Sequence, residues 1–255
     1  MLQCIAKNFF IVILFLLPYK STIAQSKKVN QFNQIWAGYI NQTRLSNRWG
    51  FHAEAHLRTN ENFIDNLSQS VLRFGGIYYI NDNTKITAGY AHFTTFSASN
   101  NTNFSTIEHR LWQQFQWFTK YPKLRLMQWI RVEERYRQKL LNDNELDNSF
   151  AFNWRIRYNI LLQVPLSKKP FQQKTFSFVT NNELLINFGK EIIYNTFDQN
   201  RFFIGFFYQP NKFDNIQMGY MNIFQQLAAG NQYRSLHVAK IIYSHNLDLR
   251  KTKKS

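Results

Sequence analysis

The chain has 255 residues, a formal net charge of +16 at pH 7, and a composition rich in aromatic residues, with 25 Phe, 13 Tyr and 6 Trp. The only cysteine, Cys4, excludes a disulfide and a cysteine metal site. No stretch after residue 24 approaches the roughly 18 apolar residues of a membrane-spanning helix, which excludes a helical membrane protein. The basic excess favours anionic partners.

The first segment, residues 1–24, has the features of a secretory signal peptide. A ten-residue apolar stretch follows Lys7, and Thr22 and Ala24 occupy positions −3 and −1 of a predicted cleavage site. The stretch is shorter than the roughly 20 residues that a helix needs to span a bilayer. We therefore expect an exported mature protein, a single domain of residues 25–255, whose net charge is +14 because residues 1–24 contain two lysines and no acids. Export argues against nucleic acid as the anionic partner.

The rest of the chain shows the two-residue period of β-strands. In residues 150–166 the even positions are apolar, as at Ile156, and the odd positions are polar, as at Arg155 and Arg157. Aromatic and β-branched residues suit such half-buried pleated surfaces. In chain order, the predicted strands cover residues 34–44, 48–59, 68–80, 84–96, 106–119, 124–138, 149–165, 174–187, 200–208, 214–225 and 234–246.

The predicted connections alternate in length along the chain. Short ones, such as residues 120–123, alternate with longer polar ones, such as residues 97–106 and 139–148. Outer-membrane barrels combine short periplasmic turns with longer external loops and have even strand counts in bacteria. The sequence therefore predicts an all-β fold, a transmembrane antiparallel up-and-down β-barrel. It has ten strands if residues 34–44 lie elsewhere, or twelve if a short first strand precedes them.

Energetics predict which way the charged faces point. An arginine on the lipid face at the bilayer midplane costs about 2–4 kcal/mol, so the arginines of a membrane barrel belong in its lumen. The candidate site is this lumen charge cluster, which consists of Glu54, Arg73, Glu108, Arg110, Arg131, Glu133, Arg135, Arg155, Arg157, Glu183 and Arg201.

Pairing the strands across their turns brings opposite charges together in the predicted barrel. A hairpin centred on Tyr121 and Pro122 places Glu108 opposite Arg135. The same register places Arg110 opposite Glu133. Other turns place Arg157 opposite Glu183, and Glu54 opposite Arg73. The cluster then has two interpretations: an anion-attracting constriction, or a structural plug of salt bridges that fills a narrow barrel.

Three histidines are candidates for catalytic or metal-binding groups. By parity His52 and His56 face the lumen beside Glu54, whereas His109 faces lipid or its interface. The sequence contains no Gly-x-Ser-x-Gly elbow, and three ligands on one strand lack a fourth partner for zinc. We therefore expect no catalytic residues, no metal and no cofactor.

Short motifs also follow one another along the chain in a recognisable order: Gln34-Ile35-Trp36, Arg58, Gly89-Tyr90, Glu108-His109-Arg110, Trp112, Glu133, Arg135, Arg155-Ile156-Arg157-Tyr158, Glu183, Asn187, Asp198-Gln199-Asn200-Arg201 and Gly219-Tyr220. In this order and spacing the chain resembles the bacterial outer-membrane barrels catalogued as domain of unknown function 2490. The resemblance implies a β-barrel in the outer membrane and supplies no activity.

The sequence thus predicts a non-enzymatic protein of the bacterial outer membrane that contacts membrane lipid and binds or passes small anionic solutes. The basic C-terminal tail, Arg250 to Lys254, is a candidate contact for anionic headgroups. One alternative is a barrel enzyme that acts on membrane lipids. Another is a soluble periplasmic β-sandwich that binds a ligand.

Overall fold

The computed structural model describes residues 27–60, 63, 66–96, 105–142, 145–168 and 171–250. The predicted signal peptide and the end of the basic tail, residues 251–254, lie outside the described residues. Within the described ranges, no helix is long and apolar enough to cross a membrane.

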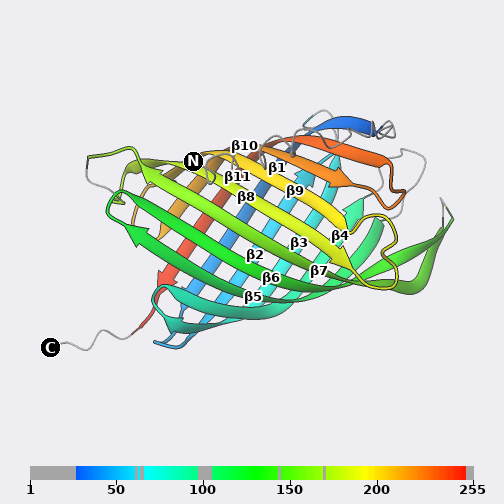
Figure 1. Ribbon diagram of the computed structural model, residues 1–255. Coiled ribbons are helices and arrows are strands. Elements are labelled where there is room, and N and C mark those ends of the chain that lie inside the picture. The colour runs from blue at the N-terminus through cyan, green and yellow to red at the C-terminus, as the bar shows by residue number, and fades with distance from the viewer. Residues whose placement is uncertain are drawn as a thin grey trace, which may run out of the picture.

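The described residues form eleven strands that close into one barrel (Figure 1). The predicted all-β barrel is therefore confirmed. The strands are β1 (Lys28–Arg44), β2 (Trp49–Thr59), β3 (Leu67–Asn81), β4 (Thr84–Phe96), β5 (Ser105–Tyr121), β6 (Leu124–Asn142), β7 (Glu145–Pro165), β8 (Thr175–Phe188), β9 (Phe197–Gln209), β10 (Asp214–Gln226) and β11 (Gln232–Asp248).

The predicted count of ten or twelve strands is wrong, and so is the purely antiparallel sheet. In a meander each strand reverses direction, so an odd count leaves the first and last strands running the same way. Here β1 and β11 pair in parallel from Lys28 opposite Gln232 to Arg44 opposite Asp248. The strand predicted at residues 34–44 is therefore β1, which begins six residues earlier and closes the barrel.

The two ends of the barrel differ. The connections after β1, β3, β5, β7 and β9 lie at one end together with the end of β11, and we call this the short-turn end. The connections after β2, β4, β6, β8 and β10 lie at the other, the long-loop end. There the β6–β7 hairpin projects past its neighbours (Figure 1), so residues 139–148, predicted as a long connection, are mostly strand.

The barrel has an apolar outside and a largely polar inside. On β7 the side chains of Ile156 and Tyr158 are about 40% exposed on the outer face, whereas those of Arg155 and Arg157 are buried inside. The outer face also carries pairs of aromatic rings toward both ends. Examples are Trp49 with Tyr78 and Phe176 with Tyr208 toward the short-turn end, and Tyr136 with Phe152 and Trp154 with Phe188 toward the long-loop end.

Glycines on the inner wall make room for large side chains. Gly75 on β3 lies opposite Gly89 on β4, and the Trp112 ring lies against Gly75. A Cβ atom at Gly89 would collide with the backbone of Phe74. Trp112 is therefore buried within the polar interior, at 1% exposure.

Candidate functional site

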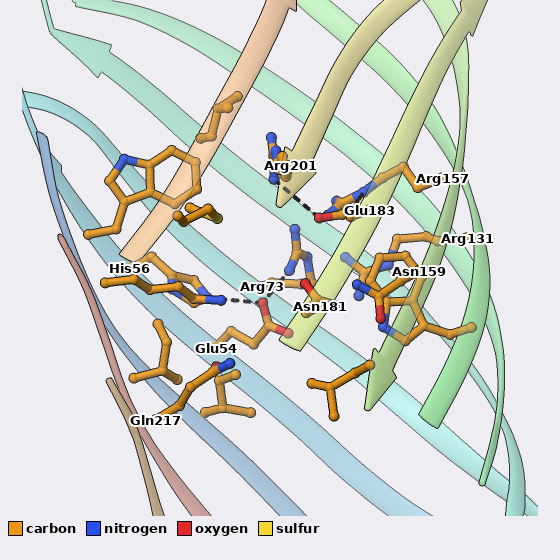
Figure 2. Close-up of a pocket in the computed structure, with 18 of the residues that line it drawn as sticks. Glu54, His56, Arg73, Arg131, Arg157, Asn159, Asn181, Glu183, Arg201 and Gln217 are labelled. Atoms are coloured by element: carbon orange, nitrogen blue, oxygen red, sulfur yellow. Dashed lines mark hydrogen bonds and ion pairs between the residues drawn. The ribbon is translucent and has the colours of Figure 1, made fainter. Parts of the chain in front are cut away.

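A cavity of about 770 Å³ occupies the lumen. Its lining includes Gln34 and Arg234 toward the long-loop end, and Gln209 and Asn246 at the short-turn end. Figure 2 shows the polar side chains of Arg73, His56 and others pointing into it from the surrounding strands. The interior of this barrel therefore contains open space along its length rather than only packed side chains.

Glu133 on β6 is the centre of the charge network and is 1% exposed. Its carboxylate accepts hydrogen bonds from Arg155 Nε at 2.9 Å and Arg157 Nη1 at 2.7 Å. Arg110 Nη1 lies 3.5 Å away and Arg131 Nη1 3.9 Å away. One buried carboxylate is thus surrounded by four guanidinium groups.

Two further acids extend the network toward the long-loop end. Glu108 accepts hydrogen bonds from Arg110 Nε at 2.7 Å and from Arg135 Nε at 2.5 Å. Arg155 Nη1 also donates to Asp198 Oδ2, at 2.9 Å. Asp198 is buried but was missing from the predicted cluster, because the sequence assigned it to the connection before residue 200. In the structure β9 begins at Phe197.

Glu183 on β8 joins two more arginines. Arg157 Nε donates to Glu183 Oε1 at 2.6 Å, and Arg201 Nη1 lies 3.6 Å from Glu183 Oε2 (Figure 2). Since Arg157 also donates to Glu133, it links the two carboxylates. The network therefore runs without a break from β5 to β9.

Glu54 forms a separate group on β2. Its carboxylate pairs with Arg73 on β3 and lies 3.2 Å from His56 Nε2 of its own strand (Figure 2). A second histidine of that strand, His52, has its Nε2 2.8 Å from the same carboxylate. No set of three or more His, Cys, Asp or Glu side chains in the described ranges is arranged to hold a metal ion. His109 lies on the outer face, where the Tyr90 hydroxyl contacts its ring.

The structure therefore brings all eleven residues of the predicted lumen charge cluster to the inner face. The predicted register holds for Glu54 and Arg73, which lie directly opposite each other. It is wrong for β5–β6, where Glu108 lies opposite Arg137 and Arg110 opposite Arg135. The β5–β6 turn is centred between residues 122 and 123 rather than 121 and 122, which shifts every pair by two.

The β7–β8 register is also shifted by two residues from the prediction. Asn159, not Arg157, lies directly opposite Glu183. The Arg157–Glu183 ion pair forms nonetheless, because an arginine side chain is long enough to reach a diagonal neighbour, about 7–8 Å away between backbones.

A second kind of arginine is held by neutral partners. Arg58 on β2 lies between Trp36 on β1 and Gln69 on β3 in the sheet. Its guanidinium carbon is 3.8 Å from the centre of the Trp36 ring, and its Nη1 donates to Gln69 Oε1 at 2.5 Å. Among the described residues, no carboxylate lies within ion-pairing distance of Arg58.

Arg131 and Arg201 are held in a similar way. Arg131 donates from Nε and Nη2 to Gln114 Oε1, at 2.9 and 2.6 Å, and its guanidinium carbon lies 4.6 Å from the centre of the Trp112 ring. Arg201 donates from Nε and Nη2 to Gln199 Oε1, at 2.8 and 2.6 Å. Their closest carboxylate oxygens are 3.9 and 3.6 Å away. We call Arg58, Arg131 and Arg201 the neutrally braced arginines.

Lys240 on β11 adds another positive charge to the lumen. Its ammonium nitrogen lies 5.0 Å from the centre of the Phe203 ring, and it forms no ion pair with any described residue. Arg58 and Lys240 were absent from the predicted cluster. Both occupy inward positions of their strands, so the strand period identifies them as lumen residues, but neither has the opposite-charge partner that defined the predicted cluster.

The lumen therefore has a large positive surplus. Of the described residues that line the cavity, eleven are Lys or Arg and four are Asp or Glu. Glu133, which is buried behind this lining, brings the number of acidic residues to five. The arrangement offers an anion that enters the lumen six more basic side chains than acidic ones, although five of the arginines are already paired with carboxylates.

Comparison with known proteins assigns a family but no activity. A family model described as a protein of unknown function (DUF2490) matches residues 33–234. That segment contains the whole predicted cluster. A search of curated proteins gave no match.

Proposed function

We propose that this chain, which belongs to the DUF2490 family of proteins of unknown function, is an outer-membrane β-barrel that binds small anionic solutes in its lumen and lets them pass. The predicted signal peptide supports export. The apolar outer face supports insertion, since exposed apolar surface of this extent is unfavourable in water. The aromatic pairs toward both ends match the two interfacial girdles of such barrels.

The observation that carries the anion proposal is the neutral bracing of arginines. In a purely structural plug, each buried arginine would be expected to have a carboxylate, because an uncompensated buried charge is costly. Here Gln69 and Gln114 position Arg58 and Arg131 with neutral hydrogen bonds. Arg58 has no described carboxylate within ion-pairing distance, and the one near Arg131, on Glu133, is 3.9 Å away and shared with three other arginines. A guanidinium that is positioned but not neutralised is a preformed donor for carboxylate or phosphate.

The cavity supports small solutes rather than macromolecules. It has about 770 Å³ of space, distributed over a lining that extends from Arg234 near the long-loop end to Gln209 at the short-turn end. Side chains such as Arg157 and Trp129 project into the same space. Anions would therefore pass in contact with the wall, as in other selective pores whose lining charges decide which ions enter.

Conductance in planar bilayers tests the proposal. We expect anion-selective steps from the wild-type protein, blocked by inorganic phosphate. Arg131→Gln should weaken that block roughly ten- to a hundredfold, because a hydrogen bond to a charged group contributes about 1.5–3 kcal/mol. Arg48→Gln is the matched control, since Arg48 lies in the β1–β2 turn and donates to the Ile80 carbonyl.

Other results would contradict the proposal. Conductance without anion preference, or equal phosphate block in Arg131→Gln and wild type, would show that the lumen arginines do not bind the anion. Lipid turnover without conductance would favour an enzyme. Release of the protein from membranes by carbonate washing would exclude the outer-membrane barrel.

A further inference from the structure

A second cavity opens from the lumen at the short-turn end. It has a volume of about 310 Å³, at the lower end of the roughly 300–1,000 Å³ range of small-molecule pockets. Four apolar side chains from four strands form most of its wall, and we call it the alcove: Phe118 on β5, Met127 on β6, Leu161 on β7 and Phe207 on β9. Its remaining lining residues are Asp82, Lys120, Arg125 and Gln163.

The charged groups of the alcove leave it with a positive surplus. Lys120 and Arg125 form no ion pair with any described residue, and the Arg125 guanidinium carbon lies 3.7 Å from the centre of the Phe171 ring. Asp82 is already engaged: Arg44 Nη1 donates to its carboxylate at 2.6 Å. That hydrogen bond lowers the pKa of Asp82 from its ordinary value of 3.8, so the carboxylate stays ionised and paired.

The apolar wall continues from the alcove into the lumen. Leu161 belongs to a buried cluster with Val179, Phe203, Met221, Ile223 and Val238 on β8 to β11, and Met127 and Phe207 pack against it. Met221 and Ile223 also line the main cavity. One side of the lumen therefore offers apolar contact, and the other side offers guanidinium groups.

We infer that the solutes of this barrel are organic anions with an apolar body, namely carboxylates with a short aliphatic chain. The chain occupies the alcove and the carboxylate faces Lys120 and Arg125. An inorganic anion would leave the apolar wall unused, and a neutral apolar molecule would make no use of the two cations. This inference rests on the proposed anion-binding function and names its solute class.

A chain-length series tests the inference directly. Binding of acetate, butanoate, hexanoate and octanoate is measured by titration calorimetry on the barrel in lipid nanodiscs, with free concentrations corrected using empty nanodiscs. Each methylene buried in the alcove should tighten binding about fourfold, which corresponds to about 0.8 kcal/mol. Octanol and octyltrimethylammonium should bind at least tenfold more weakly than octanoate, because neither is an anion.

Two variants and one control locate the site. Leu161→Gln should flatten the chain-length dependence, whereas Ile40→Gln, which changes a residue of the main cavity outside the alcove, should leave it intact. Arg125→Gln should weaken the binding of all four carboxylates by a similar factor, so that the dependence of affinity on chain length is kept. If Leu161→Gln does not fold, the wild-type series and Arg125→Gln still decide the question.

The possible failures are distinguishable. Anion-selective conductance with equal affinity for acetate and octanoate would overturn the solute class and leave the proposed function standing. Octanol binding as tightly as octanoate would also overturn it. A steep carboxylate series without any conductance would support the alcove site and contradict passage through the lumen.

Discussion

Replacing Glu133 by Gln is the strongest single test of the interior network. The carboxylate is 1% exposed and accepts hydrogen bonds from Arg155 and Arg157. Removing one partner of a buried ion pair costs about 3–5 kcal/mol, because the other charge is left uncompensated. Since Arg155 keeps Asp198 and Arg157 keeps Glu183, we expect the lower value, a loss of about 3 kcal/mol in the free energy of unfolding.

The neighbouring residue provides a matched control. Glu134 follows Glu133 on β6 but points to the outer face, where it accepts a 3.4 Å hydrogen bond from Gln113. Glu134→Gln should leave stability unchanged or raise it slightly, because it removes a charge from the apolar face. Urea unfolding in lipid vesicles, followed by tryptophan fluorescence, measures both. A loss in the free energy of unfolding below about 1 kcal/mol for Glu133→Gln, or equal losses for both variants, would refute the assignment of Glu133 to the inner face and Glu134 to the outer face.

Two other predictions concern packing and pairing. Gly89→Ala should prevent the barrel from reaching its heat-modifiable folded form on gel electrophoresis, because the new Cβ collides with backbone, whereas Gly76→Ala, with nothing within 4 Å, should fold normally. In double-mutant cycles Glu108 should couple to Arg135, its diagonal neighbour, by about 1–3 kcal/mol. Its coupling to Arg137, which lies directly opposite, should stay below about 0.5 kcal/mol, and the reverse order would contradict the ion pairs described above.

The orientation of the strands was predictable from the sequence because it depends on a local pattern. Apolar and polar residues alternate through β7, so placing Arg155 inside also places Ile156 outside. A one-residue error would expose every arginine of the strand to lipid, and this large penalty makes the prediction robust. The same reasoning placed the whole predicted cluster on one face before any contact was known.

Closure and the registers of the β5–β6 and β7–β8 hairpins were not predictable, because they depend on non-local geometry. The parallel β1–β11 pair joins residues about 200 positions apart, and neither strand carries a local mark of it. The β5–β6 register was wrong because charge matching assumed directly opposite partners. Arg135 reaches Glu108 diagonally, so the same ion pair is compatible with two registers and cannot select between them.

The neutral bracing suggests a decisive final substitution. Gln69→Glu differs from the native side chain by one atom and would place a carboxylate oxygen where Gln69 Oε1 now lies, 2.5 Å from Arg58 Nη1. A charge-assisted hydrogen bond should then raise stability by roughly 1.5–3 kcal/mol and weaken phosphate block, because Arg58 is neutralised. The two expected effects, higher stability and weaker phosphate block, distinguish the interpretations. If the lumen arginines form only a structural plug, Gln69→Glu should raise stability without any loss of anion binding.

Gln128→Glu is the control for that substitution. Gln128 lies on the outer face of β6, where it accepts a hydrogen bond from the Tyr158 hydroxyl. An acid there should lower stability and leave phosphate block unchanged. If Gln69→Glu is more stable but phosphate blocks it as strongly as the wild type, Arg58 is a structural residue. Anion recognition must then depend on Arg131 and Arg201. If Gln69→Glu instead lowers stability, Gln69 is uncharged for reasons of packing. The idea that the lumen positions Arg58 while leaving its charge uncompensated would then be wrong.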